Sequence, residues 1–352
     1  MDAENVLVGQ EEAGPSSAKN RAVGSFQSQA AARKYWIILG IVVLIGAACA
    51  LGLLAYGNPM DFGTRKWWLI AERRAEAVTA MAIVAVCQAM ATVAFHTVTN
   101  NRILTPSIMG FESLYTAINT ATVFLLGAAG FTAARHLGTF VLQLLLMVLL
   151  SLLLYTWLLT DRANNMHAML LVGIVIGGGL ASLSSFMQRL LTPSEFDVLT
   201  ARLFGSVNNA DSAYYPIAIP LVVLASAGLY LNSRKLNVLA LGRDTATSLG
   251  VNHRLNAVYT LVLISLLMAT STALVGPMTF LGFLVATLSY QFAETYDHRL
   301  LFPMAAATAF AVLTAAYFLM KHVFYAEGVV SIIIELVGGS LFLYVIMRKG
   351  RL

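Results

Sequence analysis

The sequence predicts an all-α protein that crosses a lipid bilayer about ten times. Of its 352 residues, 59% are hydrophobic and only 11% are charged, whereas soluble domains average about 45–50% apolar and about 25% charged residues. The mean hydropathy is +0.77. A chain of this composition has too few polar groups to cover a water-facing surface. This excludes an ordinary soluble enzyme, and it excludes disorder for most of the chain.

The second observation is a series of apolar runs that are separated by polar, Gly or Pro residues. A helix needs about 20 residues to cross the hydrocarbon core of a bilayer, and most of these runs reach that length. We expect membrane-spanning helices at residues 35–56, 75–97, 107–128, 138–160, 167–189, 214–232, 254–275, 278–294, 302–322 and 329–347.

The segment before the first span, residues 1–34, is polar and shows no repeating apolar face. We expect a flexible cytoplasmic tail here, followed by one transmembrane domain over residues 35–350. A cleaved signal peptide has a shorter apolar core that lies closer to the N-terminus. The length of the tail therefore argues against cleavage.

The third observation is the distribution of basic residues. Cytoplasmic segments of membrane proteins collect Lys and Arg, and Lys19, Arg21, Arg33 and Lys34 precede the first span. With the N-terminus inside, the inner segments hold 14 of the 22 Lys and Arg residues, and the outer segments hold 8. We therefore expect a multi-pass membrane protein with both termini in the cytoplasm. The net charge of +5 then follows from topology and does not indicate a nucleic-acid partner.

Residues with catalytic or metal-binding chemistry are few. Cys49 and Cys87 lie inside apolar runs and indicate no disulfide framework, and the six histidines show no metal-ligand spacing. No nucleophile lies beside a general base in a known pattern, so a membrane-embedded enzyme is the weakest hypothesis. We expect no metal site and no cofactor bound by this chain.

Two acidic residues, Glu112 and Glu335, lie clearly inside predicted spans. Burying a charge in lipid is costly, so such residues are candidates for function. Each either forms a hydrogen bond with a neighbouring helix or lines a translocation path, where it can couple transport to protons. The span at 167–189 is rich in small residues, which permit close helix packing or a wide lumen. We assign four of these to the path: Gly177, Gly178, Gly179 and Ser182.

The longest inner connection, residues 233–253, is polar and basic, with two short helix-like pieces around Gly242 and Gly250. Asp244 suits a helix N-terminus, which favours acidic residues. The residues alone leave two interpretations open. The segment is either a simple connection or a docking surface for a cytoplasmic partner.

Four stretches of the chain carry a family resemblance. They read NRILTPSIMGFESLY (101–115), LNVLALGRDTATSLGV (236–251), GPMTFLGFLVATLSYQFAETYDHRLLFP (276–303) and EGVVSIIIELVGGSLFLYVIMR (327–348). Together they resemble the FecCD-type permeases, the membrane subunits of ABC importers for iron–siderophore complexes, haem and cobalamin. The resemblance extends over about residues 40–350. The first stretch is most similar to the ferric siderophore branch.

The chain departs from the family pattern at two places. The residues ATLSY at 286–290 stand where the family has PHIAR, and Val329 stands where the family has a proline.

The resemblance implies the type II ABC importer permease fold and a chain that works within a complex. A second permease chain, identical or different, completes the path. A cytoplasmic ABC ATPase dimer drives transport, and an extracytoplasmic siderophore-binding protein delivers the cargo. ATP and Mg²⁺ belong to the ATPase, because no GxxxxGK[ST] motif occurs in this chain.

By position, the resemblance also implies roles for two groups of residues. The segment that couples to the ATPase comprises Ala240, Leu241, Gly242, Arg243, Ala246, Leu249 and Gly250. Cations at the outer face dock the binding protein, and the candidates are Arg73, Arg74 and Lys321. The family has Arg where Lys321 stands, and Lys lacks the planar fork that pairs with a carboxylate through two bonds. The alternative is that these cations only snorkel at helix ends.

The leading hypothesis is a permease subunit of a bacterial inner membrane that moves iron(III)–siderophore complexes into the cytoplasm. ATP is hydrolysed by a partner subunit, so this chain is not itself an enzyme. Cobalamin or haem is the alternative cargo. A secondary transporter driven by an ion gradient, with Glu112 and Glu335 as coupling groups, is the alternative from another class. It predicts uptake that collapses when an uncoupler is added.

Overall fold

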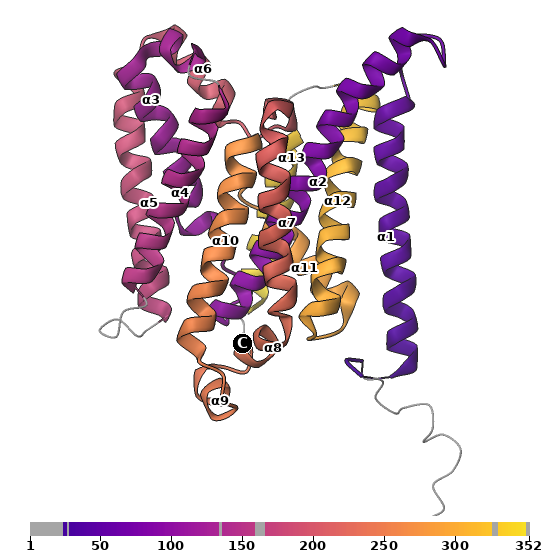
Figure 1. Ribbon diagram of the computed structural model, residues 1–352, viewed down its shortest axis with the longest axis vertical. Helices are drawn as coiled ribbons and strands as arrows, with labels where there is room; N and C mark the ends of the chain where they lie inside the picture. The colour runs from indigo at the N-terminus through magenta and orange to yellow at the C-terminus, as the bar shows by residue number, and fades with distance from the viewer. Residues whose placement is uncertain (1–23, 27, 134–135, 159–165, 326–329, 350–352) are drawn as a thin grey trace, which may run out of the picture.

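The computed structural model describes residues 24–26, 28–133, 136–158, 166–325 and 330–349, and the described chain is built from helices (Figure 1). Eight of its helices are long and apolar enough to cross a membrane, and two further apolar helices are shorter. These ten match the ten predicted spans. They are α1 (Gln29–Ala55), α2 (Arg65–Thr99), α3 (Phe111–Ala133), α4 (Leu137–Leu158), α5 (Met166–Gln188), α7 (Tyr215–Leu231), α10 (His253–Val275), α11 (Leu281–Ala293), α12 (His298–His322) and α13 (Val330–Lys349).

Two helices begin at least six residues earlier than the apolar pattern predicts. Helix α1 begins at Gln29 rather than at residue 35, because the Ser28 hydroxyl accepts a hydrogen bond from the Ala31 N–H at 3.2 Å. The predicted tail over residues 1–34 therefore ends in helix, and residues 1–23 and 27 lie outside the described residues. Helix α2 begins at Arg65 rather than at residue 75, with Thr64 as its N-cap. The charged residues of its first turns hide this start from a hydropathy pattern.

Helices α2 and α10 form the centre of the bundle. In each, 78% of the most apolar 18-residue stretch is buried, against 17% in α1 and in α5. Figure 1 shows α1 at one edge beside α12, and α3, α4 and α5 together at the other edge. The core therefore lies around α2 and α10, and the chain's edges are apolar surfaces that a bilayer or a partner chain can cover.

Short elements lie at the two ends of the bundle. Helices α8 (Ser233–Leu239) and α9 (Arg243–Ser248) lie at the same end as the start of α1 (Figure 1). Helix α6 (Pro193–Leu203) lies at the opposite end, together with the turns η3 (Val207–Asn209) and η4 (Ser212–Tyr214). A further turn, η2 (Ser107–Met109), precedes α3.

Helix α6 was not among the predicted elements, although the sequence carries its signal. Thr192 and Glu195 form a capping box, and Pro193 occupies the first helical turn. The Thr192 N–H and hydroxyl both donate to the Glu195 carboxylate, at 2.9 and 2.8 Å, and these bonds hold the pKa of Glu195 below its usual value. The hydropathy pattern missed α6 because an interfacial helix of this kind is not uniformly apolar.

The five residues 276–280, between α10 and α11, are non-helical and are packed inside the bundle. Gly276 adopts a φ of +90°, a region that L side chains rarely occupy. A Cβ on Gly205 would lie 2.0 Å from the Pro277 carbonyl oxygen, and a Cβ on Gly338 would lie 2.6 Å from Phe280 Cβ. The two glycines therefore let the chain approach the 276–280 segment from both sides, which encloses backbone that lipid could not solvate.

Candidate functional site

Glu112 and Glu335, from opposite parts of the sequence, line one cavity of about 440 Å³. Its walls are the start of α3, the 276–280 segment, α13 and the side of α5 that carries Ser184 and Ser185. The Thr279 hydroxyl donates a hydrogen bond to the Glu112 carboxylate. The structure thus brings the two intramembrane acids to one cavity, and Glu112 bonds a neighbouring segment as one of its two interpretations requires; its role in a translocation path stays a prediction.

The four small residues assigned to α5 separate into two kinds. Gly177 is a packing residue, because a Cβ there would lie 3.1 Å from the Gly110 Cα. Gly178 and Gly179 have no such neighbour within 4 Å, and the exposed Ser182 hydroxyl donates to the Gly178 carbonyl at 2.9 Å. None of the four lines the 440 Å³ cavity, to which α5 contributes Ala181, Ser184, Ser185 and Gln188.

The segment implied to couple to an ATPase forms a compact helical turn at one end of the molecule. Gly242 adopts a φ of +92° between α8 and α9, and its carbonyl accepts the Ala246 N–H at 3.0 Å. Ala246 is buried, whereas Leu241 and Leu249 are each 59% exposed. Arg243 is also exposed. The seven residues therefore comprise an inward anchor and an outward surface of two leucines and an arginine.

A cluster of polar side chains ties α8 to the ends of α2 and α12. The Asn237 Oδ1 atom of α8 lies 2.5 Å from His298 Nδ1 and also accepts the His298 backbone N–H at 3.0 Å. An amide oxygen only accepts hydrogen bonds, so His298 Nδ1 carries the proton. His298 Nε2 lies 2.6 Å from the Thr97 hydroxyl of α2. One histidine therefore joins three helices that are distant in the sequence.

Asp297, the N-cap of α12, extends this cluster to the segment before α1. Asn237 Nδ2 donates to Asp297 Oδ1 at 3.0 Å, and the Ser25 hydroxyl donates to Oδ2 at 2.7 Å. Partial burial acts to raise the pKa of Asp297. These two bonds, a bond from the Arg299 N–H and the Arg299 charge outweigh burial, so the pKa lies below its usual value. The carboxylate is therefore ionised at neutral pH.

The sequence indicated this cluster only in part. Asp297 and His298 fall within the family-like stretch at 276–303, but no role followed from it. The partners Asn237, Thr97 and Ser25 lie 60, 201 and 272 residues away from the groups they contact. No spacing rule connects positions so far apart, and only the packing of the helices shows that they meet.

At the opposite end, Arg73, Arg74 and Lys321 line one cavity of about 680 Å³. Arg74 donates to the carbonyl oxygens that end α1, including those of Tyr56 at 2.9 Å and Gly57 at 3.0 Å. It therefore caps α1 and is partly buried, whereas Arg73 is exposed. The three candidate docking residues thus lie together, but they present different amounts of charge to a partner.

No group of three or more His, Cys, Asp or Glu that would hold a metal ion occurs within the part of the chain that the structure describes.

Comparison with known proteins extends these observations. The FecCD transport family model matches residues 60–348. The chain is 53% identical to the petrobactin import system permease protein FatC of Bacillus anthracis over 334 residues, which cover 95% of this chain and 94% of that protein. It is 35% identical to the petrobactin import system permease protein YclO of Bacillus subtilis, covering 88% of this chain and 98% of that protein.

Among solved structures, the fold is similar to an inward-facing conformation of a metal-chelate type ABC transporter, with a TM-score of 0.75. That match covers 89% of this chain and 99% of the solved chain at 20% identity, so it bears on the fold alone.

Proposed function

Because this chain belongs to the FecCD transport family and is a membrane-embedded permease of an ABC importer system, we propose that it imports ferric siderophores across the bacterial inner membrane. The observation that supports this choice of cargo is the 53% identity with a petrobactin import permease over nearly the whole chain. A petrobactin-type iron(III) complex is therefore the first cargo to test. The iron enters as part of the cargo and is not a resident metal of this chain.

The proposed energy source is a cytoplasmic ATPase dimer that binds Mg-ATP and docks on α8 and α9. The exposed Leu241 and Leu249 supply an apolar contact, Arg243 supplies a charge, and the buried Ala246 fixes the turn to the bundle. This end also carries the start of α1 (Figure 1), so the N-terminus is assigned to the cytoplasm. With ten spans, the C-terminus is assigned there as well.

The Asn237–His298 contact supports a specific route for the motion. A push on α8 reaches α12 and α2 through short hydrogen bonds rather than through flexible loop. Both helices are continuous across the bundle. Movement at the ATPase surface is thereby transmitted to two long helices of the membrane-spanning bundle.

The proposed path is completed by a second permease chain. The cavity that contains Glu112 and Glu335 opens beside α5, whose Gly178 and Ser182 are exposed in the single chain. Small residues on a membrane helix permit a close partner or a wide lumen. A passage with few charged contacts suits a bulky chelate that a binding protein has already selected.

The proposed dock for the extracytoplasmic binding protein is the cavity at the end opposite α8 and α9. Arg73 and Lys321 are the cations assigned to carboxylates of that protein, and Arg74 supports the surface by capping α1. Charge pairs of this kind increase the association rate of two proteins and fix their relative orientation more than they increase the affinity. Removing Arg73 is therefore expected to slow association, with a smaller effect at high salt.

The deciding experiment tests docking and energy source together. The full chain is co-expressed with its candidate ATPase, purified in mild detergent, and assayed for retained ATPase and for uptake of a labelled ferric siderophore in cells. Gly242→Trp is expected to abolish uptake, but its positive φ strains any side chain, so Leu241→Glu with Leu249→Glu is the cleaner variant. Phe62→Glu, which replaces an 82% exposed residue at the other end, is the matched control.

We expect the wild type and Phe62→Glu to retain the ATPase and the leucine variant to lose both ATPase and uptake. Uptake by the leucine variant at the wild-type rate would contradict the coupling role. Uptake that needs no ATPase and collapses with an uncoupler would instead favour the ion-gradient carrier. Competition by cobalamin or haem, but not by ferric siderophore, would reassign the cargo.

A further inference from the structure

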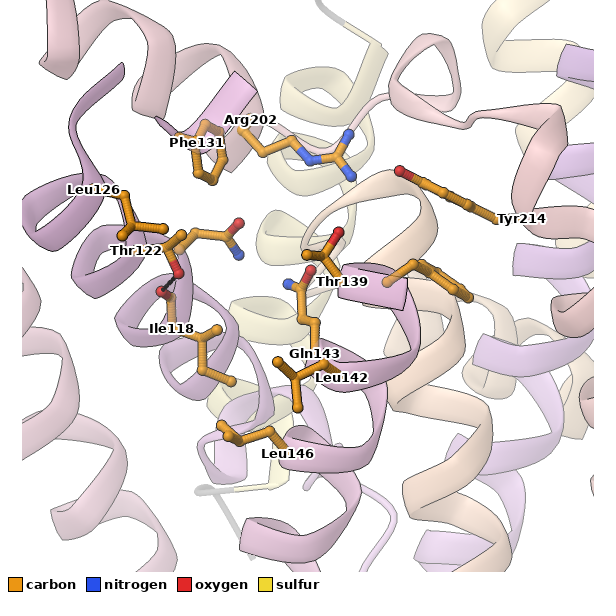
Figure 2. A pocket seen from close by; sticks show the side chains of 12 residues that line it. Ile118, Thr122, Leu126, Phe131, Thr139, Leu142, Gln143, Leu146, Arg202 and Tyr214 are labelled. Atoms are coloured by element: carbon orange, nitrogen blue, oxygen red, sulfur yellow. Dashed lines mark hydrogen bonds between the residues drawn. The ribbon is translucent and has the colours of Figure 1, made fainter. Parts of the chain in front are cut away.

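A third cavity, separate from the proposed path and from the proposed dock, lies between α3 and α4 beneath α6 (Figure 2). Its volume is about 310 Å³. Figure 2 shows Arg202 and Tyr214 at one end of the cavity, and Ile118, Leu142 and Leu146 at the other. The cavity thus has a cation at the α6 end of the bundle, with Phe131 beside it, and is apolar towards the middle of the membrane-spanning helices.

The α6 end of the cavity contains the positive charge of Arg202. The Arg202 guanidinium donates to the carbonyl oxygens of Asn209 at 3.0 Å and Ala273 at 3.4 Å. Among the residues that the structure describes, no carboxylate oxygen lies within 4.0 Å of it. A guanidinium has five N–H donors and keeps its charge. Partial burial of that charge inside a membrane protein is costly unless an anion pairs with it.

A second donor faces the same space. The Nε2 atom of Gln143 is buried and has no hydrogen-bond partner within the described part of the chain. A buried unpaired amide costs free energy, and natural proteins usually satisfy such groups with water or a ligand. Arg202 and Gln143 together therefore favour a group that is negatively charged and rich in acceptor oxygens.

The rim of the cavity is apolar and exposed in the single chain. Leu126 and Leu142 are 58% and 61% exposed, and both lie on helices of the membrane-spanning bundle. In a bilayer, the medium at this rim is acyl chain rather than water. A free anion from solution would have to cross that apolar rim, whereas a lipid already resides there.

We propose that this cavity binds an anionic phospholipid. The headgroup phosphate lies at Arg202 and Gln143, and one acyl chain follows Leu142 and Leu146 towards the bilayer centre. This orientation, with the head at the α6 end and the tail towards the middle, is the orientation of a lipid in that leaflet. The bound lipid fills the gap between α3 and α4 and neutralises Arg202. The proposal is independent of the cargo.

Native mass spectrometry of the purified full chain tests the site with dioleoylphosphatidylglycerol and dioleoylphosphatidylcholine. We expect preferential retention of the anionic lipid and a concentration-dependent rise in melting temperature, since a ligand of the folded state stabilises it. Leu146→Trp fills the apolar end and is expected to lower retention about tenfold, the loss of roughly one good contact. Leu145→Trp is the matched control, because Leu145 is 57% exposed on the same helix but does not line the cavity.

Arg202→Gln tests the charge and is expected to abolish the preference between the two lipids. If that variant fails to fold because the backbone contacts of Arg202 are lost, the comparison of Leu146→Trp with Leu145→Trp still tests whether lipid occupies the cavity. Equal retention by Leu146→Trp and Leu145→Trp would overturn the proposal. So would equal retention of the two lipids by the wild type, or an equal thermal shift with inorganic phosphate alone.

Discussion

Helices α1 and α5 occupy opposite edges of the bundle and are equally poorly buried, yet they expose different chemistry. In each, 17% of the most apolar stretch is buried. Helix α1 exposes large apolar side chains such as Leu44 and Leu51, at 69% and 65%. Helix α5 also exposes apolar residues, but one stretch of it exposes Gly178, Ser182 and Ser185. A surface of large side chains suits lipid, whereas small and polar residues suit a partner helix or a lumen.

A helix that is poorly buried in a single chain can therefore belong to either of two kinds of surface. Helix α1 packs on α12 through Gly46, where a Cβ would lie 3.0 Å from the Phe310 ring, and much of its remaining surface consists of exposed large apolar side chains. Helix α5 packs on the start of α3 through Gly177 and leaves the next glycines open. The proposed second permease chain would cover the open part of α5 and leave α1 as it is.

The largest expected effect comes from adding bulk to these two surfaces. Gly178→Trp is expected to abolish siderophore uptake, because the side chain would occupy the space assigned to the path or the partner. Leu44→Trp on α1 is the matched control and is expected to leave uptake unchanged. Uptake is measured with labelled cargo and normalised to the amount of permease in the membrane. Normal uptake by Gly178→Trp would show that α5, like α1, faces only lipid.

The second prediction distinguishes the packing role of Gly177 from the role of Gly178 in the proposed path. Gly177→Leu is expected to lower the stability of the chain by about 1–3 kcal/mol, because the added atoms meet the Gly110 backbone. Gly178→Leu should change it by less than about 0.5 kcal/mol, since nothing lies within 4 Å of its Cβ position. Denaturant or thermal unfolding in detergent measures both. Equal losses would mean that the two glycines have the same environment.

A smaller effect is expected at Asp297, which accepts a hydrogen bond from Ser25 in the segment before α1. The pKa of Asp297 is lowered in the folded chain, so its contribution to stability is complete above the unfolded pKa of about 3.9 and is lost as pH falls through the lower folded value. Asp297→Asn is expected to cost about 1 kcal/mol at pH 7, since the site is partly exposed. It should also flatten the fall in melting temperature below about pH 4. An unchanged slope would place the acid sensitivity elsewhere.

The smallest effect is expected at the ion pair between Lys34 and Glu294, whose side chains are 2.5 Å apart but 54% and 48% exposed. Exposed pairs contribute about 0–1 kcal/mol. Lys34→Ala should therefore shift the melting temperature only slightly, and added salt should remove the difference. A large, salt-insensitive loss would make the start of α1 a buried anchor rather than a surface contact.

The sequence by itself determined the class of the protein and where its ten apolar helices lie along the chain. Apolar runs of about 20 residues are stable in a lipid bilayer. A helix can form there from one segment alone, because its backbone N–H and C=O groups hydrogen-bond to each other. That is why the eight helices long enough to span a membrane, and the two shorter apolar helices, were predictable from local pattern. The capped starts of α1 and α2 and the interfacial α6 were missed because hydropathy does not register capping residues such as Ser28 and Thr192.

Only the tertiary structure decided which residues meet. Glu112 and Glu335 share a cavity, Gly177 but not Gly178 meets a backbone, and His298 joins Asn237 to Thr97. These facts depend on how helices distant in the sequence are rotated and spaced against one another. Every membrane-spanning helix is apolar on most faces, so the pattern along one helix does not determine its neighbours. Close packing at glycines and short polar contacts select one arrangement, and that arrangement exists only in three dimensions.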